Sequence, residues 1–200
     1  RAIAAGVMIS LCAALLGVIL VLKQYSLIGH GLGDVGFAST SLAVALGLPV
    51  MAVSIPIVVI AACLIMFWSQ RSKTGGDTAI GMVATGALSI GVIITAMSSG
   101  FNVDVNGYMF GSILAMSRAD VIFSVVLSIV ILVLFVVFYN RLFLITFDEN
   151  FAKASGIRVG FYQFLIALLT ALTVVMGMRM MGSLLISSLI IFPAVIARKL

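Results

Sequence analysis

The sequence predicts an all-α protein, a polytopic bundle of transmembrane helices. Hydrophobic residues make up 64% of the 200 residues and charged residues only 8%, whereas soluble domains have roughly 45–50% and 25%. Apolar runs of about 18 or more residues recur along the chain, and such a run crosses a bilayer core of about 30 Å. The net charge of +5 is therefore interpreted as membrane topology and not as a nucleic-acid-binding surface.

We expect about seven spans in one transmembrane domain that covers residues 1–200. A long connection, Ser98–Ala119, separates the fourth span from the fifth, and a polar segment, Asn140–Gly160, separates the fifth from the sixth. Pro56 predicts a kink in the third span. In chain order the spans are Ala2–Leu22, Leu27–Leu46, Pro49–Trp68, Ala79–Met97, Val121–Tyr139, Phe161–Met178 and Gly182–Ala197.

Basic residues predict the orientation, because cytoplasmic loops of membrane proteins are enriched in Lys and Arg. We place the connections after the first, third, fifth and seventh spans on the cytoplasmic side. The opposite side then keeps only three basic residues, Arg1, Arg118 and Arg179. The cytoplasmic side collects the other eight: Lys23, Arg71, Lys73, Arg141, Lys153, Arg158, Arg198 and Lys199.

The second span contains the only histidine, His30, and a carboxylate four residues later, Asp34. On a helix this spacing places both side chains on one face, about 5–6 Å apart at Cβ. Imidazole and carboxylate both bind divalent transition metals, and an ionisable residue inside a span indicates function because it costs about 2.5–3.5 kcal/mol to insert. The pair predicts a metal contact, and the alternative is a structural pair. Four small residues, which let membrane helices pack closely, surround it: Gly29, Gly31, Gly33 and Gly36.

The segment Asn140–Gly160 predicts a short cytoplasmic helix. Thr146 and Glu149 fit a capping box, and Gly156 lies where a glycine ends a helix. We therefore expect a nine-residue helix, Phe147–Ser155. An interfacial helix resting on the bilayer and a docking helix for a cytoplasmic partner both fit its single apolar stripe, which consists of Phe147, Phe151 and Ala154.

Five segments extend this interpretation. They are YSLIGHGLGDVGFASTSLAVALG, GDTAIGMVATGALSIGV, NGYMFGSILAMS, TFDENFAKASGI and MGMRMMGSLLISSLIIFPAVIAR. In this order they resemble successive signatures of the zinc and manganese ABC-importer permeases, and the similarity covers essentially the whole chain. The resemblance implies a bacterial plasma (inner) membrane protein that forms a homodimer, with two cytoplasmic ATPase subunits and an extracytoplasmic metal-binding protein. It also implies no permanently bound cofactor, and Zn²⁺ or Mn²⁺ as the transported substrate.

The resemblance also assigns residues. His30 and Asp34 match the family's translocation path, although the family pattern G-D-x-x-x-H has the two residue types in the opposite order. We favour zinc, because the glycine-flanked variant of the motif is closer to zinc permeases. The family's ATPase-coupling helix matches Phe147, Asp148, Glu149, Phe151, Ala154 and Gly156.

Relatives continue with further hydrophobic sequence after the region that matches Ala197. We therefore expect this chain to be a fragment without one or two C-terminal helices.

Three classes of function were compared. An ion-coupled secondary metal transporter or channel is the alternative to a permease, but that class favours several intramembrane ionisable residues or inverted repeats. An intramembrane metalloprotease needs an HExxH motif, which a single histidine excludes. The sequence contains no P-loop, so the protein is not expected to be an enzyme, and ATP hydrolysis is expected on a partner chain.

Overall fold

The computed structural model is a bundle of helices, and it describes residues 2–23, 25, 27–71, 76–97, 111 and 118–199. Eight helices and no strand occur in these ranges, which confirms the predicted all-α class. The helices are α1 (Ala2–Leu22), α2 (Ile28–Ala45), α3 (Val50–Arg71), α4 (Gly76–Met97), α6 (Arg118–Phe147), α7 (Glu149–Ala154), α8 (Val159–Met181) and α9 (Ser183–Lys199).

Seven of these helices occupy the positions of the seven predicted spans, but they are not equally apolar. Five of them, α1, α3, α4, α6 and α8, are long and apolar enough to cross a membrane by length and composition. The apolar part of α9, Ser183–Ala197, is shorter. The remaining helix, α2, has 18 residues and includes His30 and Asp34. The connection predicted at Ser98–Ala119 lies almost entirely outside the described residues.

Helix α6 is longer than predicted, because it continues past Tyr139 to Phe147. Leu142 and Ile145 are fully buried, so the helical backbone continues as far as side chains can pack on the core. The ring centroids of Tyr139 and Phe143 lie 5.8 Å apart, and those of Phe143 and Phe147 lie 4.4 Å apart. Such i,i+4 aromatic contacts stabilise a helix. The predicted polar segment therefore begins as the end of a long helix.

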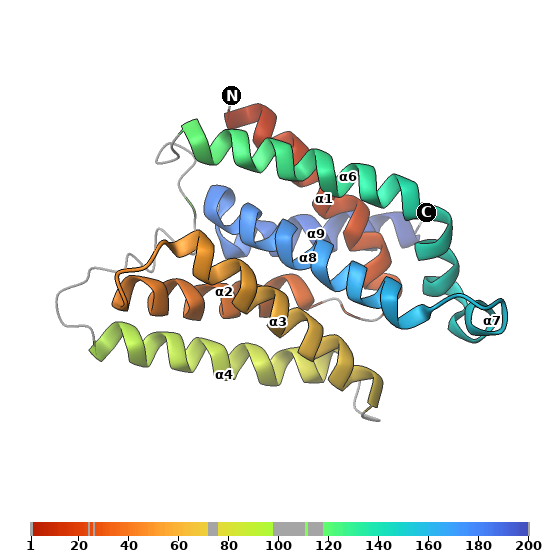
Figure 1. Cartoon of the computed structure of the whole chain (residues 1–200), viewed down its shortest axis with the longest axis horizontal. Helices are drawn as coiled ribbons and strands as arrows, with labels where there is room; N and C mark the ends of the chain where they lie inside the picture. Colours follow the sequence, from red (N-terminus) through yellow and green to blue (C-terminus); the bar gives the residue numbers. More distant parts are fainter. Residues whose placement is uncertain are drawn as a thin grey trace.

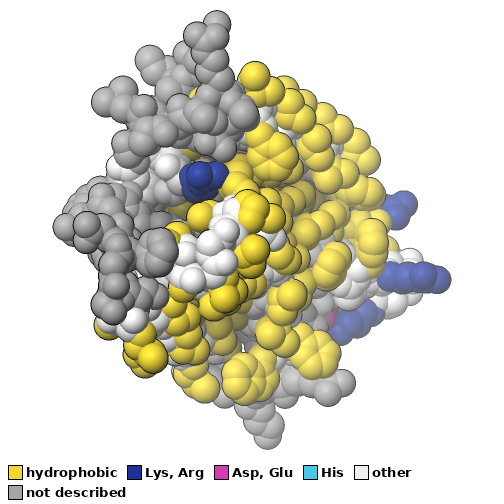
Figure 2. Space-filling view, turned by 60° about the vertical axis from the view of Figure 1, so that its left-hand side comes forward, with side chains coloured by type: hydrophobic (Ala, Val, Ile, Leu, Met, Phe, Trp, Pro, Cys, Tyr) yellow, Lys and Arg dark blue, Asp and Glu magenta, His cyan; other side chains and the backbone are white. Residues whose placement is uncertain are grey.

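The bundle has two layers in the view of Figure 1, where α3 and α8 lie nearer the viewer than α2 and α9. Helix α8 is the most enclosed, with 72% of its span buried, against 17% for α4. It contacts α1, α2, α3, α6 and α9. Figure 2 shows a broad hydrophobic surface with basic side chains toward its two ends, as expected for a surface that faces lipid.

Successive long helices run in opposite directions along the bundle (Figure 1). One end holds α7 and the start of α8, and α1 and α3 end and α2 and α4 begin toward the same end. Four of the predicted cytoplasmic basic residues belong to this end: Lys23, Arg141, Lys153 and Arg158. Arg179 lies in the last turn of α8, at the other end. The helical arrangement thus gathers basic residues as the orientation rule requires, and Lys73 and Arg1 lie outside the described residues.

This arrangement predicts the sidedness of two exposed positions in a variant whose native cysteines are replaced. A cysteine that replaces Lys153 on α7 should react with a membrane-impermeant maleimide only from the cytoplasmic side. A cysteine that replaces Leu48, 49% exposed in the α2–α3 turn, should react only from outside. Labelling in intact cells and in inverted vesicles measures both, and the reverse pattern would contradict the orientation.

The packing of α4 on α2 predicts a second outcome. A Cβ on Gly91 would lie 2.8 Å from the Phe37 ring and 3.0 Å from Cα of Ala38, whereas one on Gly86 would meet nothing within 4 Å. Gly91→Leu should therefore destabilise the protein by about 1–3 kcal/mol. Gly86→Leu on the same helix should leave stability unchanged or raised, because leucine favours helix.

Thermal denaturation in detergent would be followed by the reaction of a fluorogenic maleimide with the buried Cys12 in a Cys63→Ser background. Equal midpoints for the two glycine variants would contradict close α2–α4 packing.

Candidate functional site

His30 and Asp34 lie on one face of α2, in its first two turns. Nε2 of His30 is 3.8 Å from Oδ2 of Asp34, and the side chains are 52% and 15% exposed. This separation exceeds a hydrogen bond, so the pair is close without being locked together. The two residues lie about 3 Å and 9 Å from the N-terminal end of α2, at 1.5 Å per residue. They therefore occupy the half of the helix nearer Lys23.

Glycines allow α2 to pack closely against the helices on either side of this face. A Cβ on Gly33 would lie 3.2 Å from the Ser183 side chain of α9, and one on Gly29 would lie 3.0 Å from the Ile190 side chain. On another side of α2, a Cβ on Gly31 would come within 2.5 Å of the Ile80 side chain of α4. Residues one apart on a helix point about 100° apart, so the His30–Asp34 face lies between the α9 contact and the α4 contact.

Further polar groups continue this face along the boundary between α2 and α4. The backbone N–H of Leu27, three residues before His30, donates to Oδ1 of Asp77 at 3.1 Å. Seven residues after Asp34, the hydroxyl of Ser41 accepts from Thr95 at 3.1 Å. Residues three or seven apart on a helix lie on the same face, so Leu27 and Ser41 lie on the face of His30 and Asp34.

Sequence reasoning missed Asp77, because this residue lies between the predicted spans Pro49–Trp68 and Ala79–Met97. Its one signal was its place in the first turn of the next helix, where carboxylates are favoured.

The described part of one chain does not supply a complete coordination shell. No group of three or more His, Cys, Asp or Glu side chains gathers within the described ranges, and a structural zinc site takes four ligands. One copy therefore offers an imidazole and a carboxylate, and any further ligands must come from water or another chain. Cys12 and Cys63 are free, and Cys12 donates to the Ser128 carbonyl at 3.5 Å.

The short helix α7 has six residues rather than the predicted nine, and the predicted capping box is wrong. Asp148 is the N-cap, with extended backbone, and its Oδ1 accepts from Phe151 N at 2.8 Å. Thr146 belongs to α6, where its hydroxyl donates to the Leu142 carbonyl at 2.7 Å. The break at Asp148 also places Phe147 on α6, so Phe147 and Phe151 do not share one helical stripe.

The end of α7 is as predicted. Gly156 has φ of +77°, a conformation that favours glycine. Its N–H donates to the Lys153 carbonyl, and the N–H of Ile157 donates to the Ala152 carbonyl, both at 3.1 Å. This is the Schellman pattern of helix termination.

Glu149 anchors α7 to the bundle. Its carboxylate pairs with Lys153 at 2.7 Å and accepts from Nε2 of Gln163 on α8 at 3.2 Å. Burial lowers the pKa of Lys23 at the end of α1, while nearby Glu149 raises that pKa and Lys153 lowers it. Ala152, which belongs to α7, is fully buried. Helix α7 therefore packs on α6 and α8, is bonded to α8 through Gln163, and has its charges near Lys23 at the end of α1.

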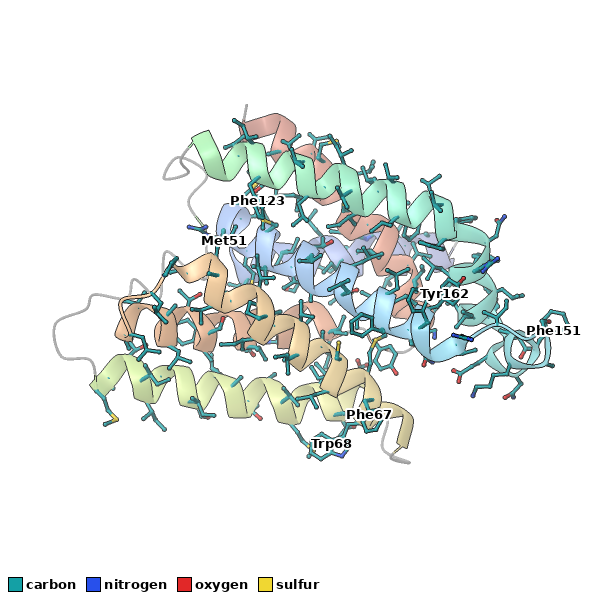
Figure 3. All side chains as sticks on the ribbon, in the orientation of Figure 1. Met51, Phe67, Trp68, Phe123, Phe151 and Tyr162 are labelled. Carbon is teal, nitrogen blue, oxygen red and sulfur yellow. The ribbon has the colours of Figure 1, made fainter. Side chains whose placement is uncertain are left out.

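The outer surface of α7 is exposed. Phe151 is 57% and Phe147 63% exposed, and Ala154 is exposed as well. Figure 3 shows Phe151 at the tip of this end of the molecule. Among the predicted coupling residues, Phe147, Phe151 and Ala154 are thus exposed to a partner. Asp148 caps the start of α7, Glu149 bonds it to α8, and Gly156 ends it.

Comparison with known proteins gives a consistent result. Residues 1–200 match the ABC 3 transport family. The zinc uptake membrane protein ZnuB of Haemophilus influenzae is 31% identical over 202 residues, which are 99% of this chain and 76% of that protein. The manganese transport membrane protein MntC of Halalkalibacterium halodurans is 28% identical, over 98% of this chain and 68% of that protein.

A solved structure, PsaBC from Streptococcus pneumoniae in complex with Fab, has a similar fold. Its TM-score to this chain is 0.83 at 29% identity, over 99% of this chain and 71% of that chain. The five segments that carry the predicted resemblance all fall within the matched residues, and this prediction is confirmed. The chain is a multi-pass membrane protein that belongs to the ABC 3 transport family.

Proposed function

We propose that this chain is the permease subunit of an ABC importer for a divalent transition metal in a bacterial plasma membrane. The observation that carries the proposal is the His30–Asp34 pair on one face of α2, a helix that packs against α3, α4 and α8, which are apolar enough to cross a membrane. The names of the two relatives, a zinc and a manganese transport protein, support the class of substrate. Zinc is favoured over manganese, because imidazole is a better ligand for zinc.

Two copies of the chain would complete the path. One pair supplies two ligands, and a homodimer with the two His30–Asp34 faces opposed would supply two imidazoles and two carboxylates. The half-exposed His30 side chain leaves room for this approach. A shell shared between copies and water holds the ion less tightly than a closed protein site, which suits a transported substrate.

The surface at α7 is proposed to bind a cytoplasmic ATPase. Exposed aromatic side chains such as Phe151 contribute strongly to protein interfaces, and the anchor at Glu149 makes α7 a fixed element. An extracytoplasmic metal-binding protein would deliver the ion to the opposite end.

The metal pair generates a prediction for transport. His30→Ala and Asp34→Ala should each suppress uptake of radioactive zinc and manganese by about tenfold or more, since losing one of few ligands weakens binding of the ion. The exchanged double variant His30→Asp with Asp34→His should recover much of the uptake, because it keeps both groups on the same face.

Ser39→Ala is the matched control, because the Ser39 hydroxyl donates to the Gly36 carbonyl of its own helix. Normal uptake by both alanine variants, with normal ATPase assembly, would show that the pair is only structural. Uptake in cells that lack the ATPase would instead favour a secondary transporter or channel.

The α7 surface generates a prediction for assembly. Phe151→Ala should weaken co-purification of the ATPase by about tenfold or more, as expected for an aromatic side chain at the centre of an interface. Phe161→Ala is the control, since Phe161 on α8 is also 57% exposed. If both variants retain the ATPase equally well, α7 is an interfacial helix and not the docking element.

A further inference from the structure

An apolar groove lies between α3 and α8, on the front of the molecule in the view of Figure 1. Its volume is about 520 Å³. Figure 3 shows Phe67 at the end of α3 that borders it. The residues that line the groove include Ile60, Cys63, Phe67, Gly160, Gln163 and Phe164.

Among the described residues, the groove opens on the outer surface of the helix bundle. Ile60 and Phe164 on its rim are 58% and 50% exposed, and both belong to helices that are apolar enough to cross a membrane. An apolar groove at this depth faces hydrocarbon chains rather than water. The chemistry that fits its lining is therefore an acyl chain.

The proposed permease dimer leaves this groove uncovered. Ile28 and Leu32 of α2 are fully buried in the core that also includes residues of α3 and α8. His30 lies on the other side of α2 and is half exposed, and α2 is in the rear layer of Figure 1. A second copy that shares the metal would approach from that rear face, opposite the groove.

An exposed basic residue lies close in the chain to the Gly160 end of the groove. Arg158, two residues earlier, is the N-cap of α8 and is exposed. No ion pair to it occurs within the described ranges. The N-terminus of the 23-residue α8 adds a partial positive charge. Basic residues where a helix reaches the cytoplasmic boundary attract anionic lipid headgroups.

We propose that this groove binds one acyl chain of an anionic phospholipid, whose phosphate lies beside Arg158 at the N-terminus of α8. The site also adjoins α7, because Gln163 in the groove wall donates to Glu149 at 3.2 Å. A lipid seated there would restrict Gln163 and through it the anchor of α7. The proposal does not depend on which substrate the protein carries.

Quenching of tryptophan fluorescence by brominated lipid tests the site. The sole tryptophan, Trp68, is replaced by phenylalanine, and a probe is introduced as Phe164→Trp in the groove or as Val136→Trp on α6. Val136 is 69% exposed and lies outside the groove. The full chain is reconstituted in phosphatidylcholine vesicles with a minor fraction of brominated phosphatidylglycerol, and in vesicles with the bromine on phosphatidylcholine instead.

We expect the groove probe to report brominated phosphatidylglycerol enriched about fivefold over its bulk fraction, and the α6 probe to report no enrichment. Arg158→Gln should abolish the headgroup preference. Gly160→Leu should fill the groove without a clash, because a Cβ there meets nothing within 4 Å, and should remove the enrichment. Gly86→Leu, equally unobstructed on α4, should not.

Two results would overturn the proposal. Equal quenching at both probes with either lipid would mean that only ordinary boundary lipid touches α8. Absence of quenching at the groove probe alone would mean that protein covers the groove.

Discussion

The close approach of α2 to α4 and α9 is the constraint on which the candidate site depends. A Cβ on Gly31 would overlap the Ile80 side chain of α4 at 2.5 Å, and a Cβ on Gly33 would be tight against Ser183 of α9 at 3.2 Å. In a membrane the hydrophobic effect does not drive helices together, so close van der Waals packing of small residues has a larger role. These two contacts fix the rotation of α2 about its axis, and this rotation decides that His30 and Asp34 point outward between the neighbouring helices.

The polarity of that face has a cost, which limits how many charged groups it can hold. Each charged residue in a span costs about 2.5–3.5 kcal/mol on insertion scales, and the low hydropathy of α2 is the reason that it is absent from the five apolar spans. The hydroxyl pair of Ser41 and Thr95 extends the polar face without adding charge. The proposed path, with one imidazole, one carboxylate and hydroxyl groups from each copy, suits an ion that must leave as readily as it enters.

Sequence reasoning predicted the helices and the His30–Asp34 face, because apolar length and the spacing of four residues are local properties. It did not predict the end of α6, because burial of Leu142 and Ile145 depends on tertiary packing. The cap of α7 was assigned to Thr146 rather than Asp148, since both residues suit an N-cap and only the break in the backbone distinguishes them. Asp77 was missed because its partner, the N–H of Leu27, lies 50 residues away in the chain.

The anchor of α7 gives a physical connection between the proposed docking surface and the metal pair. Glu149 interacts with Lys153 and Gln163 and acts on Lys23, and Lys23 is followed within five residues by the first residue of α2, Ile28. Tyr25 between the two helices is buried, and its N–H donates to the Leu20 carbonyl at 2.9 Å, so Tyr25 is held against the end of α1. Glu149, Lys23 and Tyr25 thus lie in a series between α7 and the start of α2, and coupling between distant sites requires neighbouring groups of this kind.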